Sequence, residues 1–340
     1  MRICIFGAGA IGGYVGLMLQ EGGAEVSLIA RGAHLEAIRA NGLKVVFKDG
    51  EKRGRMRATD DPAELGPQDY VIVALKAHQA WEAAERLAPL LGEHTAVATM
   101  QNGIPWWYFH GFEGQYAGLQ LQSVDPDARQ WRAIGPKRAI GATVYPAAEI
   151  AEPGVIRHIY GDKFGFGEPD RRQSERVMRL IEAFEAGGLK ARYYPEIRND
   201  IWRKLWGNLC FNPISSLTRA TLDVVATDPG TRAVARHMME EAEKIARRIG
   251  VHFRVDIERR IDGAAGVGAH RTSMLQDLER GRPIELDALL CVVQEMARIV
   301  DVETPYIDTV LALTRQMGEV AGVYPVFPEP AAEHDELAVD

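Results

Sequence analysis

The fold is decided by residues 2–12, which read RICIFGAGAIG. They open with an apolar run, Arg2–Phe6, and continue into a G-x-G-x-x-G turn made of Gly7, Ala8, Gly9, Ala10, Ile11 and Gly12. A helix-like pattern then extends to about Glu21. A buried strand that enters a helix through such a turn is typical of the first unit of a doubly wound α/β sheet.

The rest of the first half repeats this alternation of short apolar runs and helix-like stretches. Strand-like runs cover residues 25–30, 70–75 and 95–100, and they are almost continuously apolar, as strands buried on both faces should be. We therefore expect a parallel sheet with crossover helices. Further runs that are candidates to extend the same sheet cover residues 139–144, 155–160 and 189–194.

The pattern changes near Pro195, where runs with a 3.6-residue period replace the strand-like runs. We expect an α/β protein with a doubly wound Rossmann-type N-terminal domain over residues 1–194 and an all-helical C-terminal domain over residues 195–327. The last residues, 328–340, carry two prolines and five acidic residues without periodicity. That composition predicts a disordered acidic tail.

Charge and composition narrow the class of partner. The 340 residues include 47 acidic and 40 basic side chains, a net charge of −7, which argues against nucleic acid or an anionic membrane as the main partner. No apolar run approaches the ~20 residues of a membrane span, and the N-terminus does not resemble a signal peptide. The three cysteines and nine histidines show no metal-like spacing. We expect a cytoplasmic protein with reduced thiols and no metal site.

The glycine-rich turn suits a dinucleotide cofactor. Gly7 permits the tight turn, Gly9 lets the backbone approach a pyrophosphate, and Gly12 lets the helix pack closely on the strand. The helix N-terminus adds free N–H groups and a partial positive charge for the phosphates. The alternative is a tight turn without a ligand, because the spacing alone is a weak signal in a chain with 34 glycines.

Arg31 indicates which dinucleotide is bound. It follows the second strand-like run, where an enzyme that prefers NAD usually has Asp or Glu to hold the ribose 2′-hydroxyl. An arginine instead offers a fork of donors to a 2′-phosphate. The expected cofactor is therefore NADP(H). The alternative is a surface arginine at a strand end.

Several short motifs follow the glycine loop and Arg31 along the chain: Leu75-Lys76-Ala77-His78-Gln79, Gln101-Asn102-Gly103, Trp202-Arg203-Lys204-Leu205, Asn208, Asn212-Pro213, Thr272-Ser273-Met274-Leu275-Gln276-Asp277 and Glu285-Leu286-Asp287. In this order they resemble the ketopantoate reductase family over about residues 1–320. The resemblance implies NADPH-dependent reduction of ketopantoate to pantoate, a step toward pantothenate and coenzyme A. It also implies a helical domain like the C-terminal domain of 6-phosphogluconate dehydrogenase.

The resemblance further implies roles for individual residues. Lys204 matches the family's catalytic lysine, which delivers a proton to the carbonyl oxygen as hydride arrives from the nicotinamide. The residues implied to hold substrate are Asn102, Asn208, Asn212 and Ser273. Those implied to contact the cofactor, besides the glycine loop and Arg31, are Lys76, Asn102, Ala148 and Glu285. Ser273 and Glu285 each have a structural alternative, as a helix cap and as a first-turn glutamate.

The spacing of Lys204, Asn208 and Asn212 supports this reading, because residues at i, i+4 and i+8 share one face of a helix. A polar stripe among apolar neighbours favours a cleft, although a solvated helix face is the alternative. Reduction of a ketone puts negative charge on its oxygen, so a positioned cation that carries a proton is a useful catalyst. Partial burial can lower the pKa of a lysine toward the working range.

Two stretches depart from the family pattern. The stretch over residues 104–131 is longer than in typical members and rich in aromatic residues: Trp106, Trp107, Tyr108, Phe109, Phe112, Tyr116 and Trp131. Such a composition favours an interface or a pocket wall over simple core. Thr221-Leu222-Asp223 stands where the family often has a further substrate-binding asparagine. Both departures leave the natural 2-oxo acid open.

Other functions remain open at this point. The nearest alternative is an NADPH-dependent reductase of a different 2-oxo acid on the same scaffold. An alternative of another class is a non-catalytic NADPH-binding regulator, against which the stripe of Lys204 and two asparagines argues. An opine-type dehydrogenase is conceivable by analogy of fold alone. A homodimer is the default expectation for the oligomeric state.

Overall fold

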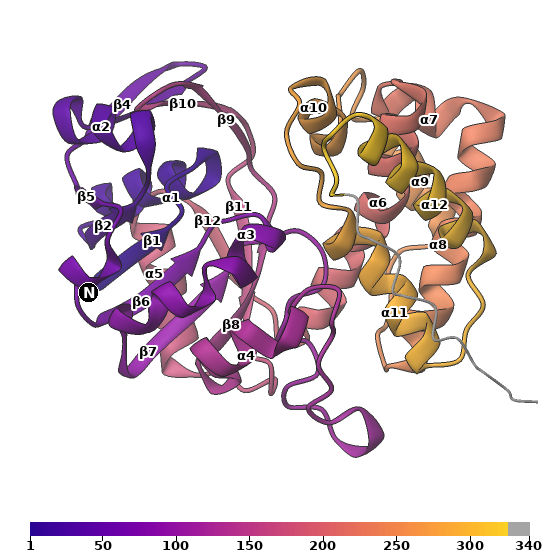
Figure 1. Ribbon diagram of the computed structural model, residues 1–340, viewed down its shortest axis with the longest axis horizontal. Coiled ribbons are helices and arrows are strands. Elements are labelled where there is room, and N and C mark those ends of the chain that lie inside the picture. Colours follow the sequence, from indigo (N-terminus) through magenta and orange to yellow (C-terminus); the bar gives the residue numbers. More distant parts are fainter. Residues whose placement is uncertain (326–340) are drawn as a thin grey trace, which may run out of the picture.

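The chain forms a sheet-based part and a helical part that meet at helix α6 (Ile197–Thr218), in a computed structural model that describes residues 1–325 (Figure 1). The predicted tail over residues 328–340 lies outside the described residues. Within these, the strands end at Tyr193 and the elements from Ile197 onward are helical. The two-domain α/β class is confirmed, and the limits 1–194 and 195–327 stay a prediction.

The N-terminal part is built on an eight-stranded sheet. Its strands follow one another in the order β12 (Lys190–Tyr193), β11 (Lys163–Gly167), β8 (Ala139–Val144), β7 (Leu91–Thr99), β6 (Gln68–Val73), β1 (Arg2–Phe6), β2 (Glu25–Ile29) and β5 (Arg57–Thr59). β11 runs antiparallel to β8, and the remaining neighbours in this sheet are parallel. From β5 to β8 the order is that of dinucleotide-binding folds, and it reverses between β1 and β6.

Both faces of this sheet are covered. Helices α1 (Ala10–Glu21) and α5 (Glu175–Ala186) pack on one face, where Ile3 and Ile5 point. Cys4 and Phe6 point to the other face and join a cluster that includes residues of η2 (Ala84–Leu90), α4 (Arg129–Ile134) and α6. Burial on both sides explains why the apolar run of β1 is uninterrupted. The remaining short elements are α2 (Gly32–Asn41), α3 (Ala77–Glu82), η1 (Pro62–Glu64), η3 (Gly114–Tyr116), η4 (Pro126–Ala128) and η5 (Pro136–Arg138).

A smaller sheet lies beside α1 and has the strand order β4 (Gly50–Gly54), β3 (Leu43–Phe47), β10 (Val155–Tyr160) and β9 (Ala147–Glu152). The prediction that residues 155–160 extend the main sheet is therefore wrong, whereas β8 and β12 do extend it. Only Ile156 of β10 is fully buried, and three of its residues are exposed. A strand of this kind lacks the second apolar face that a place inside the main sheet requires.

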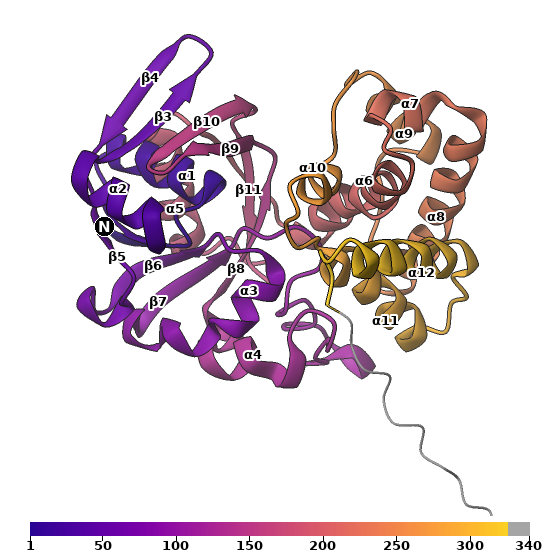
Figure 2. The same cartoon turned by 45° about the horizontal axis from the view of Figure 1, so that its top comes forward.

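The C-terminal part is arranged around α6, as Figure 2 shows. Its other helices are α7 (Leu222–Thr227), α8 (Pro229–Arg248), α9 (Ile257–Ala265), α10 (Ser273–Glu279), α11 (Val292–Ile299) and α12 (Pro305–Val320), with a π-helical turn, η6 (Asp287–Cys291), before α11. α6 contacts α7, α8, α9, α10 and α12, and its N-terminal part also packs on β8. No helix within residues 1–325 is long and apolar enough to cross a membrane.

The aromatic stretch after β7 is core, which corrects the ranking of interface or pocket wall above core. Trp106, Trp107, Tyr108 and Phe109 are each at most 2% exposed and pack in the same cluster as the start of α6. The hydroxyl of Tyr108 accepts a hydrogen bond of 2.7 Å from the Trp202 indole. The extra aromatic side chains thus fill the space between the sheet and α6, and α6 needs that support because its apolar residues are distributed around the helix.

Arg198, in the first turn of α6, holds the helix to the aromatic stretch through buried hydrogen bonds. Its guanidinium donates to three backbone carbonyls, those of Tyr108 at 2.8 Å, His110 at 2.5 Å and Pro169 at 2.5 Å. The side chain is 6% exposed, and burial lowers its pKa to about 10. One cation therefore joins the aromatic stretch, the loop after β11 and α6, and it supplies hydrogen-bond donors to three backbone carbonyls at this junction.

Replacing Arg198 by methionine should lower the free energy of unfolding by about 3 kcal/mol, because each of the three carbonyls left without a donor costs about 1 kcal/mol or more. Urea denaturation followed by tryptophan fluorescence measures this change. Arg192→Met, at an exposed position of β12, is the matched control and should stay within about 0.5 kcal/mol of the parent. Equal stabilities for the two variants would contradict the assigned role of Arg198.

Candidate active site

Lys204 lies where the two parts meet. Its ammonium donates a hydrogen bond to the backbone carbonyl of Val144, the last residue of β8, and lies 5.8 Å from the centre of the Tyr145 ring. Burial lowers its pKa to about 8, and the nearby carboxylates of Glu285 and Asp200 act in the opposite direction. A lysine with this pKa holds a proton near neutrality and can also release it. The geometry therefore suits proton transfer at the carboxyl edge of the sheet.

Asn102 and Glu285 meet at the same edge. Asn102 follows β7, and its amide donates to the Glu285 carboxylate over 3.2 Å. Gly103 allows the loop after β7 to lie close to Ala288. Its φ is +88°, and a Cβ placed on it would lie 1.8 Å from the carbonyl oxygen of Ala288. The loop after β7 is thus pressed against the π-helical turn that follows Glu285, and such turns are frequent at functional sites.

Lys76 adds a third connection between the parts. It follows β6, and its ammonium contacts the carboxylate of Asp277 at 2.7 Å and donates to the carbonyl of Pro283 at 2.7 Å. Lys76, Asn102 and Val144 therefore lie just after, or at, the ends of three parallel neighbouring strands. Carboxyl ends of such strands border the ligand crevice of doubly wound folds. The structure brings together the predicted residues that came from distant motifs.

The glycine loop has the shape that a diphosphate requires. Gly7 has φ +105°, and a Cβ on Gly12 would lie 2.1 Å from the Gly7 carbonyl oxygen, so both positions need glycine. A Cβ on Gly9 would meet no atom within 4 Å, which leaves the space beside the loop open. Helix α1 begins at Ala10 with Gly9 as its N-cap, so the amides of Ala10 and Ile11 have no intrahelical partner. The loop fits a bound dinucleotide.

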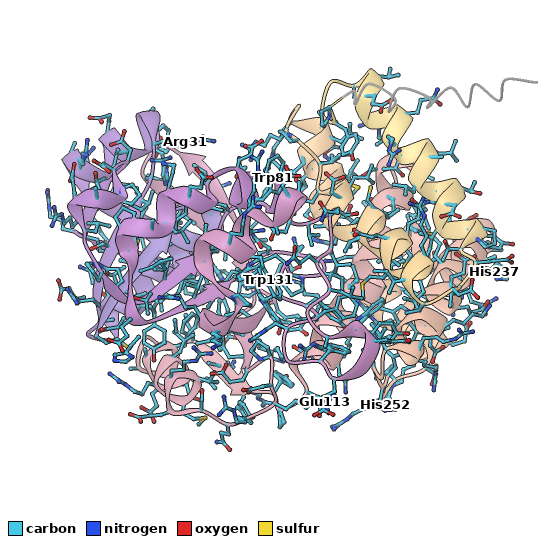
Figure 3. All side chains as sticks on the ribbon, turned by 60° about the horizontal axis from the view of Figure 1, so that its bottom comes forward. Arg31, Trp81, Glu113, Trp131, His237 and His252 are labelled. Atoms are coloured by element: carbon cyan, nitrogen blue, oxygen red, sulfur yellow. The ribbon has the colours of Figure 1, made fainter. Side chains whose placement is uncertain are left out.

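Arg31 lies at the surface of the N-terminal part (Figure 3), two residues after β2. Its side chain is exposed and makes no hydrogen bond or ion pair with any residue in the 1–325 range. His34, on the first turn of α2, lies 2.9 Å from the carbonyl of Ala8 and so joins α2 to the glycine loop. A free guanidinium next to that loop can reach a phosphate on the ribose of a bound dinucleotide.

The remaining predicted residues are placed less decisively. Asn208 and Asn212 share the face of α6 that carries Lys204, and Asn212 is 5% exposed. Ser273 is the exposed first residue of α10, whose N-cap is Thr272, so Ser273 does not cap that helix. Ala148 lies in β9 of the small sheet, which packs beside α1. No contact in the structure tests the ligand roles assigned to these four residues.

Sequence reasoning missed the group that surrounds Lys204. Asp200, 3% exposed, accepts hydrogen bonds from Thr143, from the hydroxyl of Tyr145 at 3.2 Å and from Arg203. The guanidinium of Arg203 also donates to the Tyr145 hydroxyl over 3.0 Å. A signal was present, because Asp200 precedes Lys204 by four residues and extends the polar stripe by one turn. Tyr145 directly follows β8, outside any helix or strand, so no periodic pattern of the sequence pointed to it.

Comparisons with known proteins agree with this geometry. The model of the family described as ketopantoate reductase PanE/ApbA matches residues 3–108, and that of its C-terminal domain matches residues 196–318. A 2-dehydropantoate 2-reductase of Mesorhizobium japonicum is 54% identical over 325 residues, 95% of this chain and 100% of that protein. A 2-dehydropantoate 2-reductase of Halobacterium salinarum is 30% identical and covers 93% of this chain and 98% of its own.

Solved structures extend the comparison. A candidate ketopantoate reductase from Ralstonia solanacearum superposes with a TM-score of 0.91 at 41% identity, covering 95% of this chain and 99% of that one. A D-mandelate dehydrogenase solved with NADH and anilino(oxo)acetate shares the fold at a TM-score of 0.80 and 20% identity, over 95% of this chain and 100% of its own. With both family models matched and a close relative aligned over nearly its whole length, this chain belongs to the ketopantoate reductase family.

Proposed function

We propose that this chain reduces 2-dehydropantoate to pantoate with NADPH, and that Lys204 gives the proton to the carbonyl oxygen. The observation that carries the proposal is a half-buried lysine with a pKa of about 8, held at the carboxyl edge of a dinucleotide-binding sheet. The names of the two relatives described above support the substrate. The match of the chain to both family models supports the reaction class.

NADPH fits the residues that would hold it. The open space beside Gly9 and the free amides at the start of α1 would take the pyrophosphate, and Arg31 would take the 2′-phosphate. Lys76, Asn102, Ala148 and Glu285 complete the proposed cofactor set. When bound, the reduced nicotinamide supplies the hydride.

Hydride transfer to the ketone carbon leaves negative charge on the ketone oxygen, and Lys204 acts on that oxygen. Its ammonium stabilises this charge and then transfers a proton to the oxygen. The Val144 carbonyl holds one N–H of the ammonium and so directs the others. Asn208, Asn212 and Ser273, with Asn102, orient the substrate, and Glu285 keeps the pKa of Lys204 from falling further. Asp200 has the same effect on Lys204 and is itself held by Thr143, Tyr145 and Arg203.

One observation favours a related alternative, the reduction of a different 2-oxo acid. Asp223, in the region where the family often has a substrate asparagine, accepts hydrogen bonds from the Thr221 hydroxyl at 2.5 Å and from the Val224 amide at 2.9 Å. The carboxylate of Asp223 is therefore already hydrogen-bonded within its own turn and does not replace the asparagine as a substrate contact. Turnover of a panel of 2-oxo acids with NADPH separates the two substrates, and any such turnover excludes a purely regulatory role.

We further propose a cytoplasmic location, a homodimer and domain limits at residues 1–194 and 195–327. All three cysteines are free, which supports a reducing compartment. The limits are supported by the change from strands to helices between Tyr193 and Ile197. Analytical ultracentrifugation of the purified chain measures the oligomeric state, for which a closed dimer is the commonest solution among soluble oligomers.

Lys204→Ala should lower kcat for ketopantoate by about 10²- to 10⁴-fold, because the reaction loses its general acid. The dissociation constant of NADPH should change little, since the glycine loop and Arg31 are untouched. Both quantities are measured on the same preparation, by absorbance at the nicotinamide band and by fluorescence titration. Lys48→Ala, at an exposed position, is the control. Unchanged turnover in Lys204→Ala would refute the assignment.

The pH dependence of kcat/KM should report the lysine. Reduction needs protonated Lys204, whose pKa is lowered from 10.5 to about 8, so kcat/KM should fall tenfold per pH unit above about pH 8. Glu285→Gln removes a carboxylate that raises this pKa, and the falling limb should then move to lower pH. Glu182→Gln, exposed on α5, should leave it in place. If kcat/KM of the parent enzyme fell only above about pH 10.5, the lowered pKa of Lys204 would be ruled out.

Arg31→Ser should weaken NADPH binding by about 10- to 100-fold, as expected for loss of hydrogen bonds to a charged phosphate, and should leave NADH binding nearly unchanged. Fluorescence titration with each dinucleotide measures the two dissociation constants without turnover. Arg179→Ser, exposed on α5, controls for the lost surface charge. Equal weakening of both dinucleotides would show that Arg31 does not read the 2′-phosphate.

A further inference from the structure

Arg260, on α9, lies against the helix that carries Lys204. A Cβ placed on Gly207 of α6 would be 2.1 Å from a terminal nitrogen of the Arg260 guanidinium and 2.9 Å from its central carbon. The charged end of Arg260 therefore rests directly on the backbone of α6. A glycine inside a helix costs about 1 kcal/mol relative to alanine, and here it provides the space that the guanidinium occupies.

The guanidinium of Arg260 has no counterion among the residues that the structure describes. It makes no hydrogen bond or ion pair in the part of the chain that the structure describes, although burial is strong enough to lower its pKa. The titratable groups that act on it are Cys210, Tyr145 and Arg203, and none is a carboxylate. A partly buried cation without a counterion lowers the stability of the fold unless an anion binds to it.

Neighbouring acids are already used by other arginines. Glu258 and Asp262, on the same helix as Arg260, both bind Arg232, at 2.6 Å and 2.8 Å. Glu258 also binds Arg236. Asp200, the buried acid near Lys204, is held by Arg203. Each of these acids has its own basic partner, whereas the Arg260 guanidinium has none among residues 1–325.

The position of Arg260 relates it to the proposed reaction. Gly207 follows Lys204 by three residues, which places the two on neighbouring positions of the helix surface, about 4.5 Å apart along the axis. Tyr145 lies under the Lys204 ammonium and is also among the groups that act on Arg260. The two cations thus border the same region around Tyr145.

We propose that Arg260 binds the carboxylate of the 2-oxo acid substrate while Lys204 faces the adjacent ketone oxygen. This inference rests on the proposed function and names the residue that selects an acid over a neutral ketone. The carboxylate of a 2-oxo acid is bonded directly to the ketone carbon, so two cations that border one region, as Lys204 and Arg260 do around Tyr145, can each face one of these neighbouring groups. The planar fork of an arginine can bind a carboxylate through two parallel hydrogen bonds.

The test compares ketopantoate and other 2-oxo acids with their neutral amides, bound to protein saturated with NADP⁺ so that no reaction occurs. Calorimetry should show that the parent binds an acid more tightly than its amide. Arg260→Met should weaken binding of the acid by about 10- to 100-fold and leave the amide nearly unchanged. Arg259→Met, at the exposed neighbouring position, should behave as the parent.

A second variant removes the dependence on Arg260→Met folding correctly. Gly207→Ala keeps Arg260 but puts a methyl group where the guanidinium lies, and alanine favours a helix. It should lose preference for the acid in the same way. Retention of that preference in both variants, or no preference for the acid in the parent, would overturn the proposal. Binding with this preference but without NADPH-dependent turnover would instead refute the proposed function and leave the role of Arg260 standing.

Discussion

Helix α6 is packed on the sheet domain at its start and enclosed by other helices along the rest of its length. Its first turn is fastened by the three hydrogen bonds from Arg198 to carbonyls of the sheet domain. Six residues later it carries Lys204, which donates a hydrogen bond to the last residue of β8. The angle and register of this single helix therefore set the position of the proposed proton donor relative to the proposed cofactor loop. The aromatic core under α6 is part of the same arrangement.

The charge on Lys204 results from a balance between solvent exclusion and two carboxylates. Burial alone favours the neutral amine, and Glu285 and Asp200 keep the ammonium form accessible near neutral pH. The two acids come from different places, since Asp200 lies on α6 itself and Glu285 precedes the π-helical turn. Asn102 contacts Glu285 from the sheet domain. The protonation of one side chain thus depends on how closely the two parts approach each other.

Much of the fold could be predicted because period and burial are local properties of the sequence. The run of β1 is apolar on both faces and is central, whereas β10 has one fully buried residue and joins the smaller sheet. Lys204 and the asparagines followed from helical spacing and from the family motifs. Tyr145 and Arg260 did not, because they reach this region through tertiary packing, whereas Asp200 had a signal in its spacing from Lys204 that was overlooked. The aromatic stretch was misjudged, because composition does not distinguish side chains that fill a core from side chains that face a partner.

The hydrogen bond between Lys204 and Val144 uses a backbone carbonyl as acceptor. No amino-acid replacement at position 144 removes that oxygen, so the contact depends on the path of β8 and not on the side chain there. The position of this oxygen is set instead by the pairing of β8 with β7 and β11. The placement of the Lys204 ammonium thus depends on the path of a strand backbone, and it requires no particular side chain at position 144.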